Sequence, residues 1–331
     1  MMRLVQIANP SYGRRVALVE DSKLHLLATH RSIYAFALAA IDTGCPLQEL
    51  IQTDFSDISL DYDEVYSLRS GWSFLPSFDH PEEPARCLVS GTGLTHLASA
   101  ANRDAMHTAE SVTDSMRMYH LGLEHGRPAP GETGAAPEWF YKGTGAILRG
   151  HGALLTIPNF AADGGEEPEL AAVYVIDPHG TPRRVGMTTA NEFSDHQIEK
   201  QNYLYLAHSK LRNCAIGPEL IVDPDFSLVP GTVTIMRAGS ILWTKEISTG
   251  DQRMCHSLAN IEHHHFKYEP HRRPGDAHVH FLGAGAFSFG DGITLEDGDE
   301  MMIEWKGYGR PLKNPIAKEK SEHQAVRVAA L

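Results

Sequence analysis

Two glutamates flank a single proline at the start of a strongly apolar segment. Glu167 and Glu169 stand on either side of Pro168, and residues 170–176 then read LAAVYVI. Residues two apart in a strand point to the same face of a sheet, so the two carboxylates are expected side by side. Neighbouring carboxylates repel unless a cation or a shared proton compensates. The pair therefore indicates a divalent metal site, with a solvated acidic turn as the alternative.

The residues around this pair indicate which metal the site would hold. No histidine or cysteine stands close to the pair, and an all-oxygen site favours Mg²⁺, with Mn²⁺ or Ca²⁺ as alternatives, over Zn²⁺. The run His263-His264-His265 is a competing ligand set. Three adjacent side chains cannot easily face one ion, so we expect a solvated surface there.

Composition and charge exclude several classes of partner. The formal net charge is −13 and no run of Lys and Arg exists, so nucleic acid is not an expected partner. No apolar stretch is long enough to span a membrane. The four cysteines are far apart and form no Cys-x-x-Cys pair, which is typical of a reducing compartment. We expect a cytoplasmic protein.

The order of apolar runs and turn residues predicts many short strands and few helices. Helices are expected over residues 32–41, 46–51, 99–123, 192–207 and 251–261, with Ser194 capping the fourth. A polar stretch over residues 78–84 is interpreted as a linker between a small N-terminal domain, 1–84, and a main domain, 85–331. Long connections without helices favour a β-rich α+β fold over a doubly wound α/β fold.

Five short motifs in a fixed order carry a resemblance to a known family. They are Pro137-Glu138-Trp139-Phe140-Tyr141-Lys142, Glu167-Pro168-Glu169-Leu170, Gly186 to Ser194 with Asn191-Glu192, Lys210 with Gly217-Pro218, and Pro274-Gly275-Asp276 with Gly283-Ala284-Gly285. This series, over residues 85–315, resembles the fumarylacetoacetate hydrolase family. The resemblance is greatest to the branch that acts on 2-keto-3-deoxy sugar acids in bacterial pentose and pentonate breakdown.

The resemblance implies a mixed β-sheet roll with a small N-terminal domain, usually assembled as a homodimer. It also implies a metal held by Glu167, Glu169 and Glu192. This chain departs from the family at the third ligand, where Glu192 replaces aspartate, and at Ala284, where the family has threonine. A small 2-oxo sugar acid is the implied substrate, with Lys142 and Lys210 as the implied catalytic cations.

The reaction type is the least constrained prediction. Hydrolytic relatives carry a histidine that activates water, and Ser99 stands at that position, with His96 three residues earlier. The run Glu246-Ile247-Ser248-Thr249 resembles a Thr-Ser element of the sugar-acid dehydratases. We therefore favour a Mg²⁺-dependent dehydratase that forms 2,5-dioxopentanoate. The alternatives are a C–C bond hydrolase of a 2,4-dioxo acid and a non-catalytic sugar-acid binder.

The remaining candidate site residues have assigned roles in this hypothesis. The segment 103–134 is expected to order over the substrate, with Glu110 and His107 as acid–base candidates in addition to His96. The candidate substrate-binding residues are Ser99, Arg103, Ser248 and Thr249.

Overall fold

The computed structural model describes residues 1–97, 100–101 and 113–331. The strands are β1 (Met2–Asn9), β2 (Gly13–Glu20), β3 (Lys23–Leu27), β4 (Phe55–Asp61), β5 (Ser73–Phe74), β6 (Cys87–Gly93), β7 (Glu138–Thr144), β8 (Leu148–Arg149), β9 (Leu155–Ile157), β10 (Pro168–Ile176), β11 (Pro182–Asn191), β12 (Cys214–Val222), β13 (Val229–Arg237), β14 (Ser240–Thr249), β15 (Ala277–Phe281), β16 (Glu300–Trp305) and β17 (Leu312–Lys318). The helices are α1 (Ile33–Thr43), α2 (Leu47–Leu50), α3 (Tyr62–Tyr66), α5 (Asp114–His125), α6 (His196–Gln201), α7 (Leu206–Lys210) and α8 (Leu258–Phe266).

The described strands form two mixed sheets. The larger sheet has the order β4-β3-β2-β1-β12-β11-β10-β15-β6-β7, with β5 paired to β1 and β8 paired to β12. The smaller sheet has the order β14-β13-β16-β17-β9. Most neighbours are antiparallel, whereas β15 pairs with β6 in parallel. This strand-rich, mixed architecture confirms the predicted α+β class.

The site-bearing strand, β10, lies in the middle of the larger sheet and is buried on both faces. Its alternate residues Ala171, Val173 and Val175 join a core that also contains residues of α1. Leu170 and Ala172 point the other way, into a core shared with β13 and β16 of the smaller sheet. Burial on both faces explains why this strand reads as a continuous apolar run rather than an alternating one.

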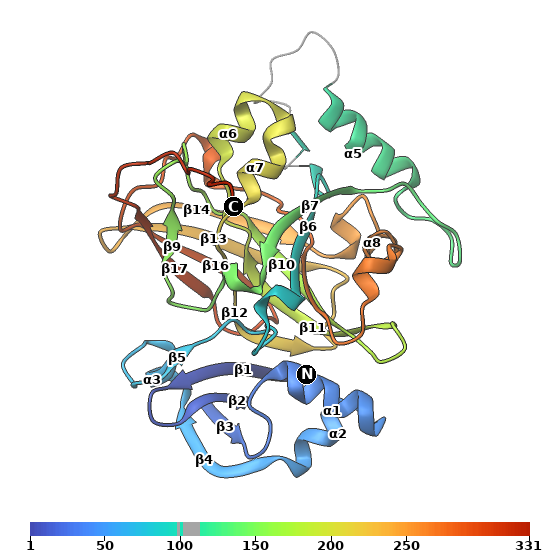
Figure 1. Cartoon of the computed structure of the whole chain (residues 1–331), viewed down its shortest axis with the longest axis vertical. Helices are drawn as coiled ribbons and strands as arrows, with labels where there is room; N and C mark the ends of the chain where they lie inside the picture. The colour runs from blue at the N-terminus through green and yellow to red at the C-terminus, as the bar shows by residue number, and fades with distance from the viewer. Residues whose placement is uncertain (98–99, 102–112) are drawn as a thin grey trace.

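The larger sheet contains strands from both sides of the predicted boundary at residue 84. β1 pairs with β12 in an antiparallel ladder from Met2–Val222 to Val5–Glu219. Figure 1 shows the N-terminal strands below the rest of the molecule. Of these strands, β1 pairs with β12 in the larger sheet. The linker stretch itself is partly enclosed, since Phe78 and His80 are buried. The two predicted domains therefore share backbone hydrogen bonds.

Local sequence signals fix the first long helix. The Ser32 side chain accepts a hydrogen bond from the amide of Ala35, which satisfies one of the free N–H groups at the start of α1. The helix ends at Gly44, whose φ of 65° is a left-handed conformation that favours glycine. The described residues contain no helix long and apolar enough to cross a membrane.

Candidate metal centre

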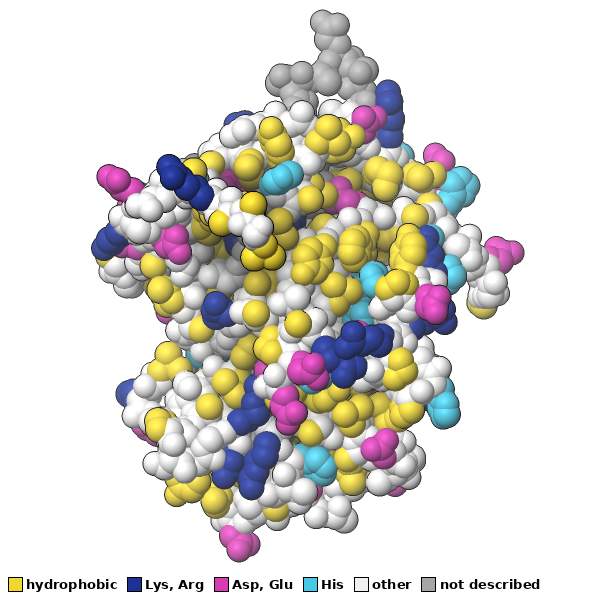
Figure 2. Space-filling model, viewed as in Figure 1, with side chains coloured by type: hydrophobic (Ala, Val, Ile, Leu, Met, Phe, Trp, Pro, Cys, Tyr) yellow, Lys and Arg dark blue, Asp and Glu magenta, His cyan; other side chains and the backbone are white. Residues whose placement is uncertain are grey.

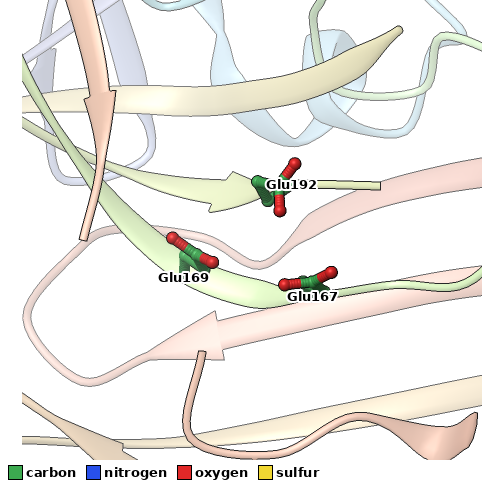
Figure 3. A group of neighbouring side chains, drawn as sticks. All are labelled: Glu167, Glu169 and Glu192. Carbon is green, nitrogen blue, oxygen red and sulfur yellow. The ribbon is translucent and has the colours of Figure 1, made fainter. Parts of the chain in front are cut away.

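Three glutamates meet where β10 begins and β11 ends. The two strands are antiparallel, with Glu169 opposite Ala190, so Glu167 and Glu192 lie next to each other just beyond the ladder. The amide of Glu192 donates to the carbonyl of Glu167 across 3.0 Å. One carboxylate oxygen from each of Glu167, Glu169 and Glu192 lies within 4.8 Å of the others. Figure 3 shows Glu192 across from the Glu167–Glu169 pair, on the adjacent ribbon.

Two lysines bind the carboxylates from different elements. Lys210, the last residue of α7, places Nζ 2.5 Å from Glu167 Oε1 and 2.5 Å from Glu192 Oε2. Lys142, on β7, places Nζ 2.5 Å from Glu192 Oε1. The Lys142 ammonium also donates to the carbonyls of Phe193 and Lys210, so its three N–H groups all have partners.

Burial makes the charges of this group interact strongly. Burial would lower the pKa of Lys210, but Glu167 and Glu192 outweigh it and raise that pKa, so the ammonium stays charged. Burial would raise the pKa of Glu167, but Lys210 and His196 outweigh it and hold that pKa well below its usual range. Burial, followed by the charges of Glu192 and Glu167, raises the pKa of Glu169 well above its usual range.

Glu169 is the carboxylate whose charge the described residues compensate least. Its Oε2 accepts a 2.7 Å hydrogen bond from the amide of Gly283, whereas neither lysine forms an ion pair with it. With all three carboxylates ionised, the two ammonium groups would leave one carboxylate charge uncompensated, which burial and the neighbouring carboxylates make unfavourable at Glu169. A divalent cation would compensate that charge, and three carboxylate donors are the ligand type that Mg²⁺ and Ca²⁺ prefer. The residues present therefore fit a hard divalent metal.

Gly283 shapes the position of Glu169. Its φ of 98° is a conformation that L side chains rarely adopt, and an added Cβ would lie 1.9 Å from Thr95 Oγ1. Glycine at this position therefore allows the backbone amide to approach the Glu169 carboxylate.

A small cavity of about 20 Å³ lies beside the carboxylates, enough for one water molecule. The described residues that line it are Gly93, Leu94, Phe140, Glu167, Glu169, His196, Glu199, Lys210, Gly283, Ala284 and Phe287. Lys210 lines this cavity, whereas Lys142 does not. Ala284, the position at which this chain departs from the family's threonine, lies on the cavity wall.

Sequence reasoning missed His196, which contacts the site directly. Its Nε2 lies 3.2 Å from Glu167 Oε1, and its ring stacks on Phe287 at 4.7 Å between centroids. Burial would lower the pKa of His196, but its hydrogen bond to Glu167 and the charge of that carboxylate raise it. The available signal was its position two residues after Ser194, the last residue of the motif that supplies Glu192.

The other predicted site residues lie elsewhere or outside the described chain. His96 Nε2 is 3.0 Å from Thr249 Oγ1, and burial lowers the pKa of His96 to about 4. Ser248 precedes Thr249 at the end of β14, and none of these three is among the described residues that line the cavity. Ser99, Arg103, His107 and Glu110 lie outside the described residues. The roles assigned to all seven stay predictions.

Two local predictions were wrong. Residues 192–195 are not helical: Ser194 and Gly165 exchange backbone hydrogen bonds of 3.0 and 2.9 Å, and Asp195 caps α6 instead. The histidine run is not a solvated surface, because His264 and His265 are buried. His265 Nε2 contacts His278 Nδ1 across 3.0 Å, so its imidazole packs on the sheet.

Comparisons with known proteins find partial sequence similarity to two sugar-acid dehydratases. No family model matches the chain. The 2-dehydro-3-deoxy-D-arabinonate dehydratase of Saccharolobus solfataricus is 30% identical over 122 residues, 35% of this chain and 40% of the relative. The probable 2-keto-3-deoxyxylonate dehydratase of Haloferax volcanii is 26% identical over 182 residues, 52% of this chain and 58% of the relative. The chain thus matches about half the length of these curated relatives.

A solved structure extends the likeness to the whole fold. The 2-keto-3-deoxy-D-arabinonate dehydratase complexed with magnesium and 2,5-dioxopentanoate superposes with a TM-score of 0.72, at 21% identity, covering 97% of this chain and 100% of the other. The shared fold and the partial sequence similarity together confirm the resemblance predicted from the sequence, which is to the sugar-acid dehydratase branch of the fumarylacetoacetate hydrolase family.

Proposed function

We propose that this protein is a Mg²⁺-dependent dehydratase that converts a 2-keto-3-deoxypentonate into 2,5-dioxopentanoate and water. The observation that carries the proposal is the buried group of three glutamates with a lysine on the cavity wall. The names of the curated relatives, and the magnesium and 2,5-dioxopentanoate in the solved dehydratase, support the choice of metal and substrate class.

The metal and the two lysines have separate tasks in this proposal. Glu167, Glu169 and Glu192 would hold Mg²⁺, which when bound supplies Lewis-acid polarisation of a 2-oxo acid. Lys142 is not among the described residues that line the cavity, so its ion pair with Glu192 holds that carboxylate in place. Lys210 lines the cavity and carries a positive charge there, so it binds the substrate carboxylate or the developing enolate oxygen.

Dehydration requires the loss of a proton and a hydroxyl group from neighbouring carbons. A base removes the C3 proton and the C4 hydroxyl group leaves as water, which gives a C3=C4 double bond conjugated with the 2-oxo group. Loss of a C5 proton and reprotonation at C3 move the double bond to C4=C5, and this enol tautomerises to the aldehyde by protonation at C4. No activated water is needed, which distinguishes this chemistry from C–C bond hydrolysis. His96 is not among the described residues that line the cavity, so it is not placed there to activate a water molecule.

The purified protein with Mg²⁺ is expected to form 2,5-dioxopentanoate from at least one 2-keto-3-deoxypentonate, and chelation by EDTA is expected to stop turnover. The product is followed by proton NMR across a panel of 2-keto-3-deoxypentonates and 2,4-dioxo acids. Pyruvate release from a 2,4-dioxo acid, with no semialdehyde from any pentonate, would identify a hydrolase instead. Binding without turnover of either class would identify a sugar-acid binder.

We also propose that the protein is a homodimer that acts in the cytoplasm. β7 lies at one end of the larger sheet, and its Trp139 and Tyr141 are 41% exposed. Figure 2 shows hydrophobic side chains gathered on the upper half of this face. The exposed apolar residues near β7 and α7 include Tyr203, Leu204, Tyr205 and Leu211. A contiguous apolar surface is typical of protein interfaces.

Light scattering after size-exclusion chromatography is expected to give twice the mass of one chain for the wild-type protein. The Tyr141→Lys variant is expected to have the mass of a single chain. The surface variant Lys245→Met is the control and should leave the dimer intact, since Lys245 pairs with Asp291 elsewhere on the surface. A monomeric wild-type protein would contradict the dimer. Fractionation of cells would check the cytoplasmic location.

A further inference from the structure

His196 has the geometry of a residue that orients a metal ligand. Its Nε2 and the ammonium of Lys210 both contact Oε1 of Glu167, at 3.2 and 2.5 Å. Among the described residues, no hydrogen bond reaches the other oxygen, Oε2. An imidazole and an ammonium that fix one oxygen determine which way the second oxygen of the carboxylate faces.

The imidazole of His196 is itself held in one orientation. It stacks on Phe287 with an interplanar angle of 9°, and Phe289 lies against it at 5.2 Å between centroids. A Cβ added at Gly165 would lie 2.5 Å from Nδ1, so the backbone of Gly165 packs closely against that edge of the ring. Nδ1 has no hydrogen-bond partner among the described residues, so the polar contact of the ring is the one that Nε2 makes with Glu167.

A fourth carboxylate, that of Glu166, supports the two phenylalanines. Glu166 is fully buried, and its two oxygens accept hydrogen bonds from the amide and the hydroxyl of Ser288, at 2.6 and 2.8 Å. Ser288 stands between Phe287 and Phe289, so this clamp fixes the residues on both sides of the His196 ring. Glu166 thus supports the carboxylate of Glu167, its neighbour in the chain. The support is indirect and passes through the turn at Ser288 and the imidazole of His196.

We propose that His196 is a positioning residue for the metal site, which holds Glu167 in its ligand orientation through Nε2. This proposal rests on the proposed function of the three glutamates as metal ligands. Removal of a residue that orients a metal ligand typically weakens metal binding by roughly 10- to 100-fold. His196 acts through Glu167 and needs no contact with substrate.

Two substitutions of His196 by an amide side chain keep an N–H donor and differ from each other in how far that donor reaches. The amide nitrogen of glutamine can occupy the position of Nε2, whereas that of asparagine reaches only the position of Nδ1. In calorimetric titration of the full chain with MgCl₂, His196→Asn is expected to weaken Mg²⁺ binding about 10- to 100-fold, and His196→Gln to stay within about threefold of wild type. The melting temperature of each metal-free variant is measured alongside.

A second buried histidine provides the matched control. His151 stacks on Tyr66 at 4.3 Å and contacts the Tyr66 carbonyl through Nε2 at 3.1 Å, but forms no contact with the three glutamates. His151→Asn is expected to lower the melting temperature and leave Mg²⁺ affinity unchanged. Wild-type affinity in both His196 variants, or equal weakening in both, would overturn the proposal. Absence of Mg²⁺ binding in the wild-type protein would instead overturn the metal site itself.

Discussion

Lys210→Met is expected to lower kcat by about 100- to 1000-fold while Mg²⁺ binding is retained. The ammonium of Lys210 lies on the cavity wall, where it meets the substrate in the proposed reaction. Removing a preorganised positive group from a buried site costs transition-state stabilisation of that order. The same change removes one of the two donors that hold Glu167 Oε1 and leaves His196 as the other. It also removes a positive charge that opposes cation binding, so Mg²⁺ binding is expected to be retained.

The measurement compares turnover of a 2-keto-3-deoxypentonate with calorimetric Mg²⁺ affinity in the same preparation. Lys245→Met is the matched control, because Lys245 pairs with Asp291 on the surface and contacts no residue of the site. Activity within about threefold of wild type in Lys210→Met would contradict the assigned role, since loss of a transition-state contact is larger than that. Loss of Mg²⁺ binding would assign Lys210 to the support of the ligands instead.

The carboxylate pair could be predicted from the sequence because the signal is local. Glu167 and Glu169 are two apart before a strand whose apolar run is unmistakable, and the period of a strand alone sets their common face. The third member could not be found in this way. Glu192 reaches the pair through the β10–β11 ladder, a non-local pairing that only the resemblance to a family indicated.

The predicted helix at residue 192 shows how tertiary contacts override local signals. Both Ser194 and Asp195 are residues that cap helices, and the sequence alone does not choose between them. The bridge between Ser194 and Gly165 keeps Ser194 extended, so Asp195 becomes the cap and its carboxylate accepts from the amide of Ile198. A shift of the helix start to His196 places that imidazole beside Glu167.

The histidines of α8 are a second case in which the local sequence did not predict the structure. A run of three polar residues near a helix end is typical of a solvated surface, yet helical spacing turns consecutive residues to different sides. His263 is exposed, whereas His265 faces the sheet and meets His278 and His280 of β15. Burial, followed by the neighbouring imidazoles, holds the pKa of His265 well below its usual range, so it packs as a neutral aromatic ring.

Glu169→Gln is expected to weaken Mg²⁺ binding by about 100-fold or more, because loss of a ligand costs more than loss of its supporting contact. Glutamine keeps the volume and can still accept from the Gly283 amide. It also removes the negative charge that Glu167 and Glu192 repel, so the fold should persist. In the wild-type protein Mg²⁺ should raise the melting temperature, since a ligand that binds only the folded state stabilises it.

The variant should lose that Mg²⁺-dependent rise while its metal-free melting temperature stays at or above that of wild type. Glu192→Asp is the contrasting variant, because it keeps the charge and shortens the side chain by one methylene. It should retain part of the Mg²⁺ affinity and part of the thermal shift. An unchanged affinity in Glu169→Gln would remove Glu169 from the ligand set. The charge of Glu169 would then be neutralised by a proton shared with a neighbouring carboxylate rather than by a metal. A shared proton is the other way in which carboxylates can lie side by side.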